Sequence, residues 1–316
     1  MLPRRSALGL LAAALSLAAS RPAGAAVPKQ LRIGYQKGEP VLVAAKANRS
    51  FETLLQPLGV EVTWLEFPFG PPILEAMRVG SVDVGAVGDA PPIFAQAGKA
   101  ELVYIGARHD NGDSYGILLP PGSTIRSLQE LKGKRVAFAR ASSAQNFTVA
   151  ALEKAGLSYA DITPVALAPA DAAAAFEHGD IDAWTIWDPY LAIAEVRPGV
   201  RLLVKTREVG VANSFYLASR DYANRYGDVL WSVVQELGRV GAWCEEHRPT
   251  LAKLLSDGTG VPLRTWQLSV DRARFVSTPI DGAVLAEQQV LADRFRRLGL
   301  IPVSINVREW AWRATS

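Results

Sequence analysis

The sequence is poor in the side chains that usually carry redox and metal chemistry, with one cysteine, Cys244, and three histidines among 316 residues. A single cysteine excludes a disulfide within the chain, so a hydrophobic core has to hold the fold together. An HExxH zinc motif and a Walker-type phosphate loop are also absent, which removes the zinc proteases and the P-loop nucleotide-binding proteins from consideration. His109, Asp110 and Asp113 lack metal-ligand spacing. We therefore predict a solvated loop there, with no metal and no cofactor in the protein.

The only membrane-directed segment in the sequence is its start. Residues 1–26 combine Arg4 and Arg5, an apolar run over 7–19 and small residues at 23–26, a pattern typical of a cleaved secretory signal peptide. The apolar run is shorter than the roughly 20 residues that span a bilayer. We predict export to the periplasm by the Sec or the twin-arginine route, and no integral membrane segment in the mature chain.

A surplus of positive charge is also missing once the leader is set aside. The whole chain has a formal net charge of +3, and Arg4, Arg5 and Arg21 of the leader account for all of it. The mature chain is therefore neutral, and this argues against a nucleic-acid or acidic-lipid partner.

What the sequence does contain is a stretch that occurs twice. Residues 80–92 read GSVDVGAVGDAPP and residues 179–191 read GDIDAWTIWDPYL. Each copy has a helix-ending glycine, a short strand and then an Asp–Pro turn that begins a new helix. Further matches occur upstream in the same order, RIGYQKG at 32–38 with RVAFARA at 135–141, and the proline turns at 67–75 and 167–174. The repeat predicts two similar halves.

The remaining pattern alternates between apolar strand-like runs and helices. It predicts an α/β protein with mostly parallel sheets and helices on both faces. The polar segment near 108–116 and the segment near 209–215 interrupt the alternation, and we predict that the chain crosses there between two lobes that close like a hinge. The predicted domains are a signal peptide at 1–26, lobe 1 at 27–112 and 214–316, and lobe 2 at 113–213. We expect Val41 to Leu58 to form one helix, and Asp281 to cap the last helix.

Ligands of open α/β sheets bind beyond the carboxyl ends of the strands, where helices begin. The corresponding turns predict these contacts: Gln36, Gly70, Pro71, Gly88, Asp89, Ala90, Ser142, Ser143, Asn146, Trp187, Asp188, Ser214 and Phe215. Ser142 to Gln145 fits a capping box. The carboxylates of Asp89 and Asp188 would repel an anion, so we expect them to accept N–H groups of their own helices. Trp187 is expected to form an aromatic wall, and the predicted ligand is a small anion with an organic tail.

Several of these segments resemble the aliphatic sulfonate-binding branch of the periplasmic substrate-binding proteins of ABC importers. They include LRIGYQKG at 31–38, WLEFPFGPP at 64–72, GDAPPIFAQA at 88–97, KGKRVAF at 132–138, SSAQN at 142–146 and WTIWDPY at 184–190. The resemblance implies two type II-like lobes that close on a small organosulfonate and deliver it to a membrane permease. It also suggests Arg272 or Arg274 as an anion ligand, and we take the protein to be a monomer.

Two alternatives remain open at this point. One is a binder of taurine, nitrate or another small anion. The other is a desulfinase-like enzyme of the same fold, which would need a nucleophilic cysteine. Cys244 lies in the middle of a predicted helix, far in sequence from every predicted turn, and free cysteines are usually buried. We therefore predict a non-catalytic binding protein.

Overall fold

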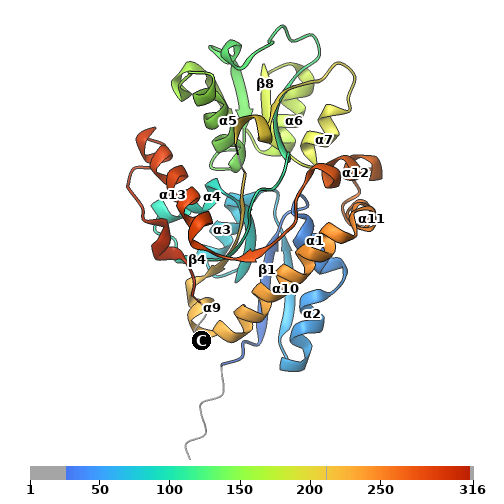
Figure 1. Ribbon diagram of the computed structural model, residues 1–316, viewed down its shortest axis with the longest axis vertical. Helices are drawn as coiled ribbons and strands as arrows, with labels where there is room; N and C mark the ends of the chain where they lie inside the picture. The colour runs from blue at the N-terminus through green and yellow to red at the C-terminus, as the bar shows by residue number, and fades with distance from the viewer. Residues whose placement is uncertain (1–25, 211, 314–316) are drawn as a thin grey trace, which may run out of the picture.

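The computed structural model describes residues 26–210 and 212–313. The chain forms two lobes, one above the other in Figure 1, each built around its own β-sheet. We call lobe 1 the part around the six-stranded sheet and lobe 2 the part around the five-stranded sheet. The predicted signal peptide lies outside the described residues except for Ala26.

Lobe 1 has the strand order β11-β4-β10-β3-β1-β2. Its strands are β1 (Gln30–Tyr35), β2 (Glu61–Glu66), β3 (Val84–Gly88), β4 (Leu102–Arg108), β10 (Ser214–Ser219) and β11 (Thr278–Pro279). Its helices are α1 (Pro40–Ala47), α2 (Ser50–Leu55), α3 (Gly70–Arg78), α4 (Ala90–Ala97), α9 (Arg220–Arg225), α10 (Gly227–Glu246), α11 (Arg248–Thr259), α12 (Leu263–Arg272) and α13 (Gly282–Arg297). Two apolar clusters, one holding Leu31 and Leu42 and the other Ile73 and Phe295, pack helices against the sheet.

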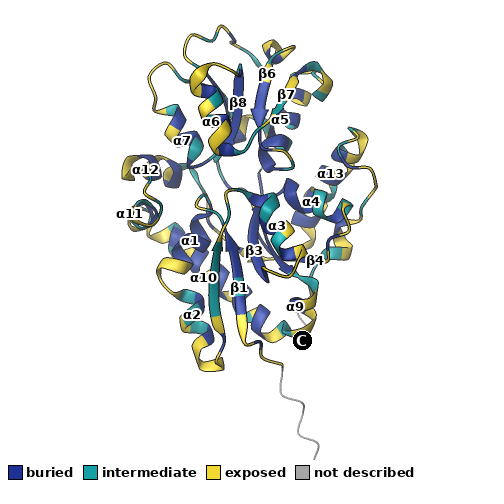
Figure 2. Ribbon diagram, turned by 180° about the vertical axis from the view of Figure 1, so that it is seen from behind, coloured by how far each residue is buried: buried dark blue, intermediate teal, exposed yellow. Residues whose placement is uncertain are grey.

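Lobe 2 has the strand order β7-β6-β8-β5-β9. Its strands are β5 (Tyr115–Leu119), β6 (Arg135–Phe138), β7 (Thr163–Ala166), β8 (Ala183–Trp187) and β9 (Arg201–Lys205). Its helices are α5 (Ser143–Lys154), α6 (Pro169–His178), α7 (Tyr190–Glu195) and α8 (Thr206–Val209). The central strands of both lobes are buried, whereas the outer faces of the helices are exposed (Figure 2).

The sheets are mixed rather than mostly parallel as predicted. In lobe 1, β10 is inserted between β3 and β4 and runs antiparallel to both. In lobe 2, β5 is inserted in the same way between β8 and β9. Each of these strands is the first one after the chain crosses into its lobe, and the two crossings fall at the predicted positions near 108–116 and 209–215. The strand that follows each crossing runs antiparallel to its two neighbours. The alternation of strands and helices in the sequence does not indicate this change of strand direction.

The repeat corresponds to a structural unit that both lobes contain. In lobe 1, Arg32 at the start of β1 binds Asp83 just before β3, with 2.6 Å between Nη2 and Oδ1. In lobe 2, Arg135 at the start of β6 binds Asp182 just before β8 at 3.1 Å. In both lobes the backbone N–H of the arginine also donates to the same carboxylate. The matched residues therefore join the two central parallel strands at the end of each sheet that lies away from the other lobe.

Two local predictions have different outcomes. The side chain of Asp281 accepts hydrogen bonds from the N–H groups of Ala283 and Val284, so the predicted cap of α13 is confirmed. The predicted helix from Val41 to Leu58 is divided into α1, α2 and a short 3-10 turn. Arg49 takes a left-handed backbone conformation with φ of 54°, which ends one helix and lets the next begin at an angle. Among the described helices, none is long and apolar enough to cross a membrane.

Candidate functional site

The starts of four helices, three of them carrying prolines at their first positions, converge on a cavity between the lobes. Residues at or next to the first turns of α1, α3 and α4 in lobe 1 line it together with those of α5 in lobe 2. The lining residues are Gln36, Gly38, Glu39, Pro40, Gly70, Ala86, Val87, Gly88, Pro91, Arg108, Asn111, Ser114, Tyr115, Ser142, Ser143, Trp187, Asp188, Ser214, Trp266, Ser269, Val270, Ala273 and Phe275. Backbone N–H groups and the positive ends of the helix dipoles meet here, a common arrangement in anion sites.

The cavity is small as the two lobes stand. The volume open to the centre of a water molecule is about 60 Å³, a few times the roughly 10–15 Å³ that one water needs. That space suits a compact polar group such as the headgroup of a small anion.

The start of α5 carries a hydroxyl group that has no partner of its own. Ser143 is buried, and its Oγ has no hydrogen-bond partner among the described residues. It lies against Gly88 of lobe 1, where a Cβ would come within 2.0 Å of the Ser143 Oγ. Only glycine permits this approach. The hydroxyl is therefore held at the wall of the cavity, where an anion could accept its hydrogen bond.

The predicted capping box at this helix start is wrong. The hydroxyl of Ser142 donates to the carbonyl of Ala139 at 2.6 Å instead of accepting an N–H group of the helix. Gln145 Oε1 accepts the N–H of Ala141 at 2.7 Å. The side chain of Ser142 therefore does not cap α5. The N–H groups of Gln145 and Asn146 donate instead to the backbone carbonyl of Ser142.

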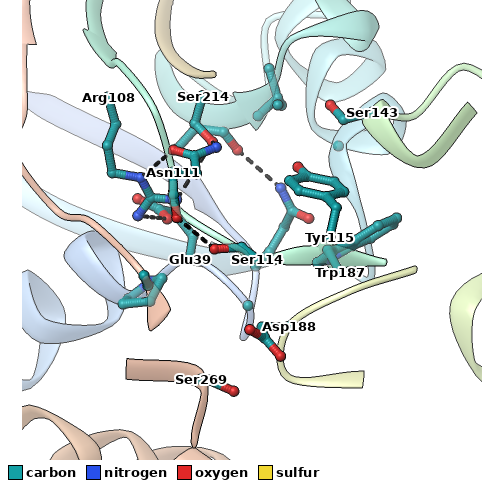
Figure 3. A pocket seen from close by; sticks show the side chains of 18 of the residues that line it. Glu39, Arg108, Asn111, Ser114, Tyr115, Ser143, Trp187, Asp188, Ser214 and Ser269 are labelled. Carbon is teal, nitrogen blue, oxygen red and sulfur yellow. Dashed lines mark hydrogen bonds and ion pairs between the residues drawn. The ribbon is translucent and has the colours of Figure 1, made fainter. Parts of the chain in front are cut away.

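A buried ion pair forms one side of the cavity. Arg108 Nη1 lies 3.0 Å from Glu39 Oε2, and both side chains are buried. Arg108 also donates through Nε to Asn111 Oδ1 at 2.8 Å, and Asn111 in turn donates to Ser214 Oγ (Figure 3). Burial opposes the charge of Arg108, but attraction to Glu39, together with smaller contributions from the Tyr216, Tyr115 and Cys244 side chains, raises the pKa of the guanidinium. Among the described lining residues Arg108 is the only Lys or Arg, and Glu39 offsets its charge.

Aromatic and apolar side chains form the other walls. Tyr115 and Trp187 of lobe 2 lie side by side, with ring centroids 6.4 Å apart (Figure 3). The predicted wall residue Trp187 is thus in place. From lobe 1, Trp266 and Val270 of α12 and Phe275 after it line the cavity as well. This apolar wall from α12 was not predicted, because nothing in its local sequence distinguishes it from an ordinary amphipathic helix.

Arg272 joins the two lobes at one rim of the cleft. From the end of α12 its Nε and Nη2 donate to both oxygens of Asp188 in lobe 2, at 2.7 and 2.6 Å. Its Nη1 donates to Glu195 at 2.7 Å. Burial opposes the charge, but these two carboxylates hold the pKa of Arg272 above its ordinary value. The predicted anion ligand is therefore already bound to two carboxylates and does not line the cavity.

The expectation for Asp188 is confirmed in part. Its Oδ1 accepts the N–H of Ala192 in α7 at 3.1 Å, as expected for a carboxylate turned toward its own helix. Both of its oxygens also bind Arg272, which the sequence did not predict.

Asp89 joins the lobes at the opposite rim, where α4 meets α5 in both Figure 1 and Figure 2. Asn146 of lobe 2 donates from Nδ2 to Asp89 Oδ2 at 2.7 Å, and Arg294 of α13 donates to Asn146 Oδ1 at 3.2 Å. The expectation that Asp89 caps its own helix is wrong, because its side chain makes no cap hydrogen bond. Burial raises the pKa of Asp89 to about 6 despite the hydrogen bond from Asn146.

The structure thus divides the predicted site residues into two groups. Those that line the cavity are Gln36, Gly70, Gly88, Ser142, Ser143, Trp187, Asp188 and Ser214. Those that lie outside the lining are Pro71, Asp89, Ala90, Asn146, Phe215 and Arg272. Of these, Phe215 is fully buried in the core of lobe 1. The lining residues Glu39 and Arg108 were missed, although both belong to turns that the sequence marks as strand ends.

Residues considered for catalysis or metal binding lie elsewhere. Cys244 of α10 is fully buried in the core of lobe 1 and outside the cavity lining, and burial raises the pKa of its thiol to about 12. The loop at 109–113 is less solvated than expected, because Asp113 is buried and paired with Arg207. Among residues 26–210 and 212–313, no group of three or more His, Cys, Asp or Glu could hold a metal ion.

Two lobes of mixed α/β structure, two crossings and a cleft lined by helix starts define the class of two-lobed binding proteins. The profile of the NMT1-like family matches residues 24–256, most of the chain, and the protein belongs to that family. Among solved structures, the alkanesulfonate-binding protein SsuA from Xanthomonas axonopodis pv. citri bound to MOPS is 40% identical, with a TM-score of 0.88. The match covers 92% of this chain and 100% of that one.

Two further solved structures share the two-lobed fold of this chain. The periplasmic aliphatic sulphonate binding protein SsuA from Escherichia coli is 39% identical, with a TM-score of 0.82, over 92% of this chain and 94% of that one. The desulfurization enzyme DszB has a TM-score of 0.64 over 90% of this chain and 96% of that one, at 15% identity. At that identity the likeness to DszB concerns the fold alone.

Proposed function

We propose that this protein is the periplasmic substrate-binding component of an ABC importer, which captures a small aliphatic sulfonate between its lobes and delivers it to the membrane permease. The names of the two SsuA relatives, at 40% and 39% identity over nearly the whole chain, support this function. The expected leader at 1–26 supports a periplasmic location by the Sec or the twin-arginine route. We assign lobe 1 to 27–112 and 214–316 and lobe 2 to 113–213, and we take the protein to act as a monomer.

The chemistry of the cavity supports an anion of this type. A sulfonate is the base of a strong acid, so it enters as a monoanion with three acceptor oxygens and no proton to donate. The cavity offers two kinds of neutral donor: the first turn of α5, which has no side-chain cap, and the hydroxyl of Ser143. Arg108, the one Lys or Arg among the described lining residues, is paired with Glu39. Hydrogen bonds from donors to a charged acceptor contribute about 1.5–3 kcal/mol each. Several such bonds, less the cost of association, support a Kd of about micromolar.

The single observation that carries the proposal is Ser143. A buried hydroxyl without a partner is costly in the free protein, and a bound anion would satisfy it. We assign the sulfonate group to the first turn of α5 beside Ser143, Gly88 and Gln36. The organic tail would then lie along Trp187 and Trp266.

The test is calorimetric titration of the purified protein with ethanesulfonate, butanesulfonate, taurine and nitrate. We expect the alkanesulfonates to bind more tightly than nitrate, which has no tail to occupy the apolar wall. Ser143→Ala should weaken sulfonate binding about tenfold or more, corresponding to one hydrogen bond to a charged group. Ser232→Ala, a matched change on the surface of α10, should leave binding unchanged. Tighter binding of nitrate or taurine than of ethanesulfonate and butanesulfonate would favour the alternative anion binder.

An enzyme of the desulfinase type remains the alternative from another class. Release of sulfite from an aryl or alkyl sulfinate by the purified protein, abolished in Cys244→Ser, would establish it. The buried Cys244, with its raised pKa, argues against a thiolate nucleophile.

A further inference from the structure

Asp89 is a carboxylate that is buried at the lobe interface with an incomplete set of partners. Its exposure is 6%. Oδ2 accepts the hydrogen bond from Asn146, whereas Oδ1 is buried without a partner among the described residues. The preceding residue, Gly88, lines the cavity. A charged carboxylate is therefore held next to the place where the ligand anion would lie.

Within residues 26–210 and 212–313, no lysine or arginine pairs with this carboxylate. On α5 it faces Ser143 and Asn146. On α13 it faces Gln288, which donates to its backbone carbonyl, and beyond Asn146 lies Arg294. The strands β4 and β5 bring the phenols of Tyr104 and Tyr115, which stay protonated because burial raises their pKa values. On α3, Glu75 and Arg78 pair with each other at the surface. Arg294 connects to Asp89 only through Asn146.

Ser143 connects Asp89 to the ligand cavity. Its hydroxyl is close enough to Asp89 to lower the pKa of the carboxyl group, yet it completes no hydrogen bond of normal geometry there. One hydroxyl proton can be donated to one acceptor at a time. A charged Asp89 competes for it with the ligand, whereas a protonated Asp89 leaves it to the ligand.

We propose that the protein takes up a proton on Asp89 when it binds its anion, so that anion and proton are held together in the closed cleft. This inference rests on the proposed function. The bound anion adds a second negative charge beside a carboxylate that no cation neutralises, and protonation removes the repulsion. Protonation also releases the Ser143 hydroxyl to the anion. The Asn146 hydrogen bond between the lobes survives, because the second oxygen of a carboxylic acid still accepts.

The proton linkage has a measurable size. The pKa of Asp89 is about 6 in the absence of ligand. If the bound anion keeps the group protonated up to pH 8, linkage requires the Kd to rise about 50-fold between pH 6 and pH 8. The ligand contributes no proton of its own, since a sulfonate does not titrate in this range.

The experiment is calorimetric titration with ethanesulfonate at pH 7.5 in buffers of low and high ionisation enthalpy. We expect the wild-type protein to take up about one proton for each ligand bound, and Asp89→Asn to take up none. Because asparagine resembles the neutral acid, the variant should bind at pH 8 as the wild type does at pH 6. His109→Gln serves as a control, because this exposed histidine lies at the hinge and pairs with Glu287.

The outcomes separate this inference from the proposed function. Binding of ethanesulfonate with no proton uptake and a constant Kd from pH 6 to pH 8 would overturn the inference and leave the function intact. Proton uptake that persists in Asp89→Asn or disappears in His109→Gln would also overturn it. If the wild type binds no sulfonate at any pH, both fail. If Asp89→Asn does not fold, the buffer dependence of the binding enthalpy in the wild type and in His109→Gln still tests the inference: proton uptake in both supports it, and its absence in either overturns it.

Discussion

Replacing Arg272 by glutamine tests whether the contact between α12 and lobe 2 stabilises the closed cleft. The arginine donates to both oxygens of Asp188 and to Glu195 at 2.6–2.9 Å. Its side chain is 17% exposed, and those of Asp188 and Glu195 are 9% and 20% exposed. Removing one partner from a fully buried ion pair costs about 3–5 kcal/mol, and the partial exposure reduces this to roughly 2–3 kcal/mol.

This cost should affect closing rather than folding. Arg272 belongs to lobe 1 and both carboxylates belong to lobe 2, so the arginine meets them only when the cleft is shut. In an open form, water hydrates the arginine and the carboxylates separately. Each 1.4 kcal/mol corresponds to a factor of ten in Kd, so Arg272→Gln should weaken ligand binding by about 30- to 150-fold. The ligand-free melting temperature should change little.

The assay is titration with the best alkanesulfonate, together with small-angle X-ray scattering of the ligand-bound protein. Arg274→Gln is the matched control, because Arg274 lies two residues away and pairs with Asp110 while its side chain is 65% exposed. Such an exposed pair is worth about 0–1 kcal/mol. A Kd within threefold of wild type for Arg272→Gln, together with a lowered ligand-free melting temperature, would refute the reasoning. The contact would then stabilise the folded protein rather than the closed cleft.

Three further predictions concern residues near the cleft. Phe215→Ala should destabilise the protein by about 3–5 kcal/mol in urea unfolding, because its ring is fully buried against Tyr104; a lost affinity at unchanged stability would contradict this. Gly88→Ala should weaken ligand binding about tenfold or more through its clash with Ser143 in the closed form, and an unchanged Kd would show that the lobes need not approach so closely. Asp89 holds its proton more tightly in the folded protein than in the unfolded chain, since its folded pKa is about 6 instead of 3.8. The stability that the protonated carboxyl group contributes is therefore lost as the pH rises from about 4 to 6. Between pH 4 and 7.5 the free energy of unfolding of Asp89→Asn, measured in urea, should rise by up to about 3 kcal/mol relative to that of the wild type. A difference between the two proteins that stays constant over this range would show that the folded pKa is not raised.

Prediction from the sequence succeeded where neighbouring residues decide the structure. The strand and helix starts around Gly88 and Trp187 follow from glycine, proline and β-branched runs, and the cleft forms where those turns meet. The prediction failed where a competing local partner was available. Ser142 donates to the carbonyl of Ala139 instead of capping α5. A serine hydroxyl can bind either of two nearby backbone groups, and the sequence does not indicate which one it binds.

The sequence by itself determined the two-part repeat, the α/β class, the crossings and the cap at Asp281, because each depends on residues a few positions apart or on a pattern repeated along the chain. Only the tertiary structure decided which charges meet. Arg272 and Asp188 are separated by 84 residues, and Glu39 meets Arg108 only because the turn before α1 and the end of β4 both line the cavity. Pairing of charges depends on distance and burial in the folded molecule, so residues that look like anion ligands in the sequence can bind one another in the structure.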